Sequence, residues 1–275
     1  MPYFGDIGKA ASDLLGGYQF DHKFSVAGKT ANGLSLTTNG KKKGEGVSGD
    51  LKASYCPQKG ITIDAGTDSS GKIDTTITLD EVCAGLKAAL SANMPCKDSG
   101  KLAFTYSGIS GVGIKADTGL KMDPKINANA AYSYGSAIIG TSLAYDVAKG
   151  SLSKYDVAAQ YDGGDFVVGA SACDALNTLK VSYLHKVASD ISIAGECVHK
   201  TCAKSGKVDT SFAVGGLKKL DGGASAKAHM TGAGIASLFY SQELRPKTTG
   251  TVCTQFDLKD FDKAAKFGLE IKTKA

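Results

Sequence analysis

Apolar and polar side chains alternate with a period of two along almost the whole chain, and this pattern constrains the fold more than any other feature. Near the C-terminus, for example, Phe267, Leu269 and Ile271 alternate with small or charged residues. Because successive side chains of a strand point to opposite faces, each such segment is predicted to be a β-strand with one apolar and one polar face. Short polar turns between the segments predict antiparallel neighbours. We therefore expect a long meander of strands.

The alternation begins near Tyr18 and continues to the C-terminus. Turn signals such as Asn32-Gly33 separate the segments at regular intervals. Counting the segments predicts about nineteen strands. No change in composition marks a domain boundary, so residues 18–275 are expected to form one all-β unit.

Residues 2–17 break this pattern. Ile7, Ala11 and Leu14 have the spacing of one helical face, polar residues lie opposite them, and two glycines end the run. This predicts one amphipathic helix of about three turns within residues 1–17. Such a helix is too short to be stable alone in water, so it should dock on the rest of the protein. Its polar face predicts a wet docking surface.

The two faces of the strands distinguish a soluble sandwich from a membrane barrel. In a barrel the apolar face contacts lipid and the polar face lines a lumen. The apolar faces here are rich in tyrosine, which suits the interfaces of a membrane, and nineteen strands exceed what an open twisted sheet carries. We therefore predict an all-β transmembrane barrel that is wide enough to leave an aqueous channel.

Composition excludes several other classes. The net charge of +5 comes from 32 Lys and Arg residues, of which only Arg245 is arginine, so the chain has few of the planar groups used for specific nucleic-acid recognition. No apolar run is long enough for a membrane helix and no secretory signal is found, so synthesis should begin in the cytosol, which disfavours a bacterial porin. The seven scattered cysteines are interpreted as free thiols, with a Cys197–Cys202 disulfide as the alternative.

Short motifs give no indication of catalysis. Residues 44–49 fit G-x-G-x-x-G, but a strand rather than a helix is predicted to follow, so a dinucleotide site is rejected. The four histidines are isolated and lack metal-binding spacing, and no nucleophile motif is present. We expect no enzyme activity, no metal site and no cofactor.

The N-terminal DIGKAASDLLGGYQF, the Gly85-Leu86-Lys87 triplet and the closing LFYSQELRP and KFGLEIK resemble the voltage-dependent anion channels, the mitochondrial porins. The resemblance covers the whole chain in order and length. It implies a barrel of nineteen strands, the odd number for which this family is the standard example, with the helix inside the pore. It also implies that the strand near Phe24 closes in parallel on the strand near Leu269.

The function that the resemblance implies is a voltage-gated, weakly anion-selective channel of the mitochondrial outer membrane for ATP, ADP, phosphate, chloride and other small solutes. It leaves self-association open. Of the basic residues tied to nucleotide contact in animal relatives only Lys9 matches, and Ala65 stands where some of them carry a lipid-facing carboxylate. The helix and gating residues that it implies are Asp6, Lys9, Ser12, Asp13, Gly16 and Gly17.

Lysines on the polar faces outweigh the neighbouring acids only modestly, which predicts a weak anion preference set by electrostatics in a wide, wet pore. The alternative is an ordinary solvated lysine face. A voltage response needs charge that moves through the field, worth roughly 2.3 kcal/mol per charge per 100 mV; Lys9 and Asp13 are candidates. The predicted pore-lining lysines are Lys23, Lys29, Lys52, Lys87, Lys101, Lys115, Lys121, Lys154, Lys180, Lys186, Lys207 and Lys227.

Two other functions remain open from the sequence. A soluble all-β binding protein would be expressed without detergent. The protein-import pore of the same membrane would share the barrel, but it usually carries a longer N-terminal extension and an acidic interior, whereas the lumen predicted here is slightly basic.

Overall fold

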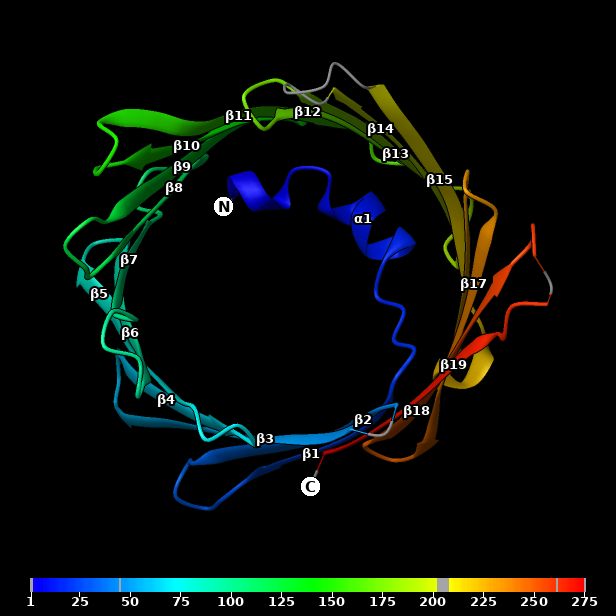
Figure 1. The fold of residues 1–275 in the computed structure, drawn as a ribbon, viewed down its shortest axis with the longest axis horizontal. Coiled ribbons are helices and arrows are strands. Elements are labelled where there is room, and N and C mark those ends of the chain that lie inside the picture. Colours follow the sequence, from blue (N-terminus) through cyan, green and yellow to red (C-terminus); the bar gives the residue numbers. More distant parts are fainter. Residues whose placement is uncertain (1, 45, 202–207, 261, 275) are drawn as a thin grey trace.

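The computed structural model describes residues 2–44, 46–201, 208–260 and 262–274. These residues form one 19-stranded sheet that closes into a barrel around an open lumen (Figure 1). The strands are β1 (His22–Lys29), β2 (Ser35–Lys43), β3 (Gly46–Gln58), β4 (Ile61–Asp68), β5 (Ile73–Cys83), β6 (Leu86–Met94), β7 (Lys101–Tyr106), β8 (Val112–Gly119), β9 (Lys125–Tyr134), β10 (Ala137–Asp146), β11 (Ser151–Asp162), β12 (Phe166–Cys173), β13 (Thr178–Lys186), β14 (Ile191–Thr201), β15 (Val208–Lys219), β16 (Ser225–Thr231), β17 (Ile235–Arg245), β18 (Thr248–Asp257) and β19 (Lys266–Lys274).

Each strand pairs antiparallel with its neighbours in sequence, and the barrel closes by one parallel pairing. In that pairing Phe24 of β1 lies opposite Ile271 of β19. The predicted parallel closure is therefore confirmed. An odd number of strands requires it, because the first and last strands of such a meander run in the same direction.

The apolar side chains face outward. Phe24 is 53 % exposed, Tyr132 51 % and Leu238 49 %, and each alternates along its strand with an inward polar or small residue. A water-soluble protein would bury such side chains in a core, so this outer surface is the lipid-facing surface of a membrane barrel. The soluble all-β alternative is not supported.

The N-terminal segment, residues 2–21, lies inside the lumen (Figure 1), but it is not one continuous helix. A 3₁₀ turn, η1 (Phe4–Asp6), is followed by Gly8 in the left-handed region (φ 73°) and then by the seven-residue helix α1 (Lys9–Leu15). The predicted short amphipathic helix near the N-terminus is therefore confirmed, but it is shorter than the predicted three turns. Gly8 breaks it, because its N–H bonds to Gln160 of the wall, 2.8 Å away, instead of continuing a helix.

A second 3₁₀ turn, η2 (Asp221–Gly223), precedes β16. Neither this turn nor any other helix in the described part of the chain is long and apolar enough to span a membrane.

Candidate functional site: the pore lumen

Helix α1 docks on an apolar patch of the inner wall. Its Ala11 and Leu14 are buried against Val167 of β12, Leu184 of β13 and Ala194 of β14. The prediction of a wet docking surface is therefore wrong. Val167, Leu184 and Ala194 are apolar residues at inward positions of these strands, and only the tertiary structure shows that they lie under the helix.

Three polar contacts hold the N-terminal segment, residues 2–21, on the wall at three points along its length. At its start, the ammonium group of Lys115 lies 3.9 Å from the centre of the Tyr3 ring, a cation–π distance. In the middle is the bond from Gly8 to Gln160. At the end of α1, Lys227 donates a hydrogen bond of 3.1 Å to the carbonyl of Asp13. A cation there satisfies a terminal carbonyl and opposes the negative end of the helix dipole.

The connection from α1 to β1 also lies against the wall. The Tyr18 ring packs on His229, with 4.8 Å between ring centres, and meets Phe239 edge-on at 6.3 Å. Cys253 of β18, on the same part of the wall, is only 1 % exposed. Burial raises the pKa of the Tyr18 phenol to about 12, so it is neutral at any physiological pH. The connection is therefore part of the docked segment rather than a free tether.

The residues predicted to form the helix and gate differ in their surroundings. Lys9, Ser12 and Asp13 are exposed to the lumen on the face of α1 opposite Leu14. Asp6 caps η1 by accepting a hydrogen bond from the N–H of Tyr3 at 3.0 Å. No ion pair involves Lys9 within the described residues, so it is a charge available to permeating ions.

The end of α1 is defined by the two predicted glycines. The N–H of Gly16 bonds to the carbonyl of Ser12 at 2.8 Å and closes the last turn. Gly17 follows with φ 84°, in the left-handed region, where a side chain would be strained. These glycines therefore turn the chain out of the helix and along the wall.

The predicted pore-lining lysines lie on inward positions of their strands, with two exceptions. Lys121 lies beyond the end of β8, in the turn that follows, and Lys207 lies outside the described residues. Several of the others are paired with acids: Lys23 with Glu270 at 3.4 Å, Lys87 with Asp80 at 2.9 Å, Lys101 with Asp117 at 3.1 Å and Lys180 with Glu196 at 2.8 Å.

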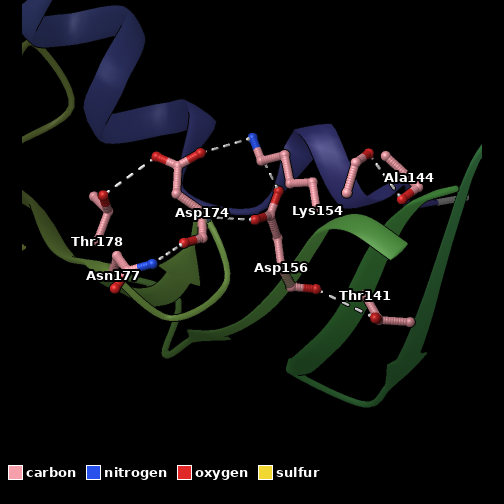
Figure 2. A network of polar contacts seen from close by, with 8 residues as sticks. Thr141, Ala144, Lys154, Asp156, Asp174, Asn177 and Thr178 are labelled. Atoms are coloured by element: carbon pink, nitrogen blue, oxygen red, sulfur yellow. Dashed lines mark hydrogen bonds and ion pairs between the residues drawn. The ribbon is translucent and has the colours of Figure 1, made fainter. Parts of the chain in front are cut away.

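Lys154 is part of a larger polar network (Figure 2). Its ammonium group lies 3.3 Å from carboxylate oxygens of both Asp156 and Asp174. Asp156 also accepts a hydrogen bond from the N–H of Asp174 at 2.8 Å, and Asp174 accepts one from the hydroxyl of Thr178 at 3.2 Å. This network fixes the turn between β12 and β13 to the neighbouring strand, so the Lys154 charge is largely neutralised.

The remaining lysines keep more of their charge for solutes. Lys29 and Lys52 are exposed and no ion pair is found for either in the parts of the chain that the structure describes. Lys186 donates to the carbonyl of Gly164 at 3.0 Å, which leaves its charge uncompensated. Between the N-terminal segment and the last strands, a recess of about 610 Å³ is lined by a group of lysines with two glutamates: Lys23, Lys227, Lys247, Lys272, Lys274, Glu243 and Glu270.

A part of the wall away from the N-terminal segment, which we call the acidic wall, carries inward carboxylates that the list of predicted pore-lining residues does not include. Asp50 of β3, Asp64 of β4 and Asp74 of β5 occupy inward positions. Asn39 donates a hydrogen bond to Asp50 at 2.7 Å, while Asp64 and Asp74 have no ion pair within residues 2–44, 46–201, 208–260 and 262–274. The polar positions of the strand alternation would have identified them. The acidic wall therefore places negative charge on the same inner surface that carries the lysines.

The described residues also bear on the dinucleotide motif, the metal site and the disulfide that were considered from the sequence. Gly46 begins a strand rather than a helix, unlike a dinucleotide-binding loop. Among the described residues, no group of His, Cys, Asp and Glu could hold a metal ion. Cys197 is a free thiol; Cys202, its alternative disulfide partner, lies outside the described residues.

Comparisons with known proteins agree with this geometry. Residues 1–268 match a family model described as eukaryotic porin. The chain is 31 % identical to mitochondrial outer membrane protein porin 1 of Oryza sativa subsp. japonica, covering 98 % of the chain and 97 % of the relative. It is 33 % identical to the 34 kDa mitochondrial outer membrane porin of Solanum tuberosum and 31 % identical to the outer plastidial membrane porin of Pisum sativum, each with 98 % and 97 % coverage.

Solved structures share the barrel architecture. A mutant of Rh. blastica porin superposes with a TM-score of 0.52 at 10 % identity, over 84 % of this chain and 96 % of the other. A second mutant of the same porin gives 0.51 at 10 % identity, over 82 % and 96 %. At this identity the likeness concerns the fold alone.

Proposed function

Since the chain belongs to the eukaryotic porin family and forms a β-barrel pore for small solutes in the mitochondrial outer membrane, we propose that this pore weakly prefers anions and closes partially under voltage. The proposed solutes are ATP, ADP, phosphate and chloride. The observation that carries the proposal is the uneven charge of the lumen, in which exposed lysines lie on and beside the docked N-terminal segment.

The charges on the inner wall support a small preference for anions over cations. The lysine-rich recess and Lys9 raise the local concentration of anions near the N-terminal segment, without any ring of groups narrow enough to strip water from an ion. Asp64 and Asp74, on the wall away from the segment, act in the opposite direction. Several other inward lysines, among them Lys87, Lys101 and Lys180, are paired with acids. In a wide pore with this charge distribution, the electrostatic field of the wall charges, and not a specific binding site, determines which solutes pass more easily.

For the voltage response, we propose that the N-terminal segment carries the moving charge. Lys9 and Asp13 belong to α1, which is held by side-chain contacts and not by strand pairing. Releasing such contacts costs far less than breaking the sheet, since the barrel strands are hydrogen-bonded on both sides. Nucleotide contact at Lys9 is part of the same proposal.

The test is a planar-bilayer recording of the refolded full-length protein in a KCl gradient. We expect large conductance steps, a reversal potential on the anion side at low voltage, and partial closure at both polarities. Lys9→Glu should move the reversal potential toward cations, with Ser12→Ala, on the same exposed face of the helix, as the neutral control. Open channels that are cation-selective or independent of voltage would contradict the proposal.

The protein-import alternative is weaker. The relatives described above carry porin names, and the lumen combines basic and acidic walls instead of presenting an acidic path. If basic presequence peptides block the current strongly while adenine nucleotides do not, the import alternative gains support and the anion-channel proposal fails.

A further inference from the structure

Five inward glycines of the barrel wall lie directly beneath the N-terminal segment. We call them the wall glycines: Gly113 of β8, Gly140 of β10, Gly169 of β12, Gly215 of β15 and Gly268 of β19. They come from strands spread over more than half of the barrel, so sequence spacing does not relate them. What relates them is the path of residues 2–21 across the inner wall (Figure 1).

At four of the five wall glycines a Cβ would approach atoms of the segment more closely than carbon atoms normally do. A Cβ at Gly113 would overlap the carbonyl oxygen of Pro2 and lie 2.9 Å from the Tyr3 ring. At Gly140 it would lie 2.9 Å from Ile7 and 3.0 Å from Phe4.

Further along the segment, wall atoms also limit the space. At Gly215 a Cβ would lie 2.9 Å from Leu15 of the segment and 2.8 Å from the carbonyl oxygen of Ala228 in the wall. At Gly169 it would be in ordinary contact with the Cα of Gly8, at 3.4 Å, and its closest neighbour would be the hydroxyl of Ser182 in the wall, at 2.9 Å. At Gly268 it would overlap the carbonyl oxygen of Gln19 and lie 2.7 Å from the Cα of Phe20. The glycines therefore follow the segment from its first described residues to its connection with β1.

The wall between these glycines is also made of small residues. Gly113 pairs with Ala131, Ala131 with Gly140, and Gly140 with Ala158, so four inward neighbours in a row lack any side chain beyond Cβ. Ala131 is only 3 % exposed and Ala158 only 4 %. The segment accounts for this burial, because η1 contacts β9 and β10.

At Gly113 and Gly268, barrel geometry alone does not demand glycine, because the nearest atoms that a Cβ would meet all belong to the segment. Gly119 lies on β8 six positions from Gly113 and faces the same lumen, yet a Cβ there would meet only the Lys121 side chain and the Gly100 carbonyl, at 3.8 Å or more. That is ordinary van der Waals contact. At Gly113 and Gly268, the need for glycine therefore comes from the segment and not from the strand.

We propose that the wall glycines are positioning residues of the conducting pore: they let the N-terminal segment lie against the wall and thereby set the free cross-section of the lumen. Adding a methyl group would displace the adjacent part of the segment toward the pore axis by about 1 Å, the difference between the distances above and a relaxed carbon contact. The inference depends on pore formation but not on the proposed anion preference or voltage response.

The experiment compares Gly113→Ala and Gly268→Ala with the matched control Gly119→Ala in the full-length refolded protein. These sites act at opposite ends of the segment and carry no charge. Single-channel conductance at low voltage and exclusion of neutral polymers report the cross-section. The rate of tryptic cleavage after Lys9, the only lysine or arginine among residues 1–21, reports how firmly the segment is docked.

We expect Gly113→Ala and Gly268→Ala to lower the conductance and to speed cleavage after Lys9, while Gly119→Ala behaves as the parent protein. Channels of parental conductance in both wall variants, or an equal loss in Gly119→Ala, overturn the proposal. If one wall variant does not refold to the parental strand content by circular dichroism, the conductance and cleavage rate of the other variant alone test the proposal. The reversal potential in a KCl gradient, measured on the same channels, tests the anion preference separately.

Discussion

At the scale of single residues, two features shape this pore: small residues at inward positions of the wall, and a few residues with strained backbone conformations. Asp174, Ala175 and Leu176, in the turn between β12 and β13, all have positive φ, between 54° and 67°. Consecutive left-handed residues other than glycine are unfavourable, and the turn is held by the contacts that Asp174 makes with Lys154 and Asp156. The network in Figure 2 therefore offsets backbone strain with polar contacts.

Replacing Ala175 by glycine should stabilise this turn. The left-handed conformation costs roughly 1–2 kcal/mol for an alanine. Glycine gives the unfolded chain more conformational freedom, which lowers stability by about 0.4–1 kcal/mol. The free energy of unfolding should therefore rise by about 0–1.6 kcal/mol. Thermal unfolding in detergent measures it. Ala188→Gly, in the next hairpin turn and without positive φ, is the control and should destabilise. A lower melting temperature for Ala175→Gly would contradict the strain assignment.

At the scale of elements, the N-terminal segment and the barrel are held by different forces. The strands form a closed hydrogen-bonded sheet, whereas the N-terminal segment is attached by side-chain packing, including the apolar cluster under α1, and by three polar contacts. A seven-residue helix has little stability of its own. Its position therefore depends on the wall, and changes to the wall or the helix should move the segment without unfolding the barrel.

Leu14→Ala tests this separation. Removing a buried leucine side chain typically costs about 2–5 kcal/mol, and here the loss should fall on docking of α1. We expect faster tryptic cleavage after Lys9 and noisier open-channel current, with an unchanged melting temperature of the barrel. Ser12→Ala, on the exposed face of α1, should leave all three unchanged. A large drop in the barrel melting temperature would show that helix and barrel unfold together.

The acidic wall provides a second prediction at this scale. Asp64→Asn combined with Asp74→Asn removes two inward negative charges from β4 and β5 that have no ion pair within the described residues. Anion preference should increase, measured as a larger reversal potential in a KCl gradient. Asp98→Asn, in the turn between β6 and β7, makes the same chemical change outside the strands and should have a smaller effect. An equal shift for Asp98→Asn would mean that total charge, and not the wall, sets selectivity.

At the scale of the whole molecule, the outer apolar surface, the odd strand number and the mixed charge of the lumen together define a wide pore in lipid. Selectivity that arises from a diffuse field depends on screening. The Debye length falls from about 30 Å at 0.01 M salt to about 3 Å at 1 M. At high salt, most ions crossing a wide lumen are therefore shielded from charges on its wall.

We therefore expect the anion preference to fade as the salt concentration rises. For a fixed ratio of KCl concentrations across the bilayer, the reversal potential should be largest with dilute solutions and approach zero with concentrated ones. The same series on the Lys9→Glu variant should converge to the same high-salt value. A reversal potential independent of concentration would indicate a specific binding site instead of a diffuse field.

Much of the molecule could be predicted from the sequence, for a local reason. The period-two alternation depends only on the geometry of a strand, so nearly all strands, their inward and outward faces and the lipid-facing surface follow from it. The parallel closure of β1 on β19 followed from the odd strand number that the family resemblance supplied. The inward positions of lysines such as Lys23 and Lys180 followed from the same alternation.

Other features depend on residues that are distant in sequence and were decided only by the tertiary structure. The break at Gly8 exists because Gln160 of the wall binds its N–H. The apolar docking patch brings together Val167, Leu184 and Ala194 of three strands, none of which is distinctive alone. The wall glycines have a common role only because one segment crosses them all. The sequence determined the barrel, since its pattern is local; the position of the segment inside it required the closed barrel, since that position arises from contacts across the lumen.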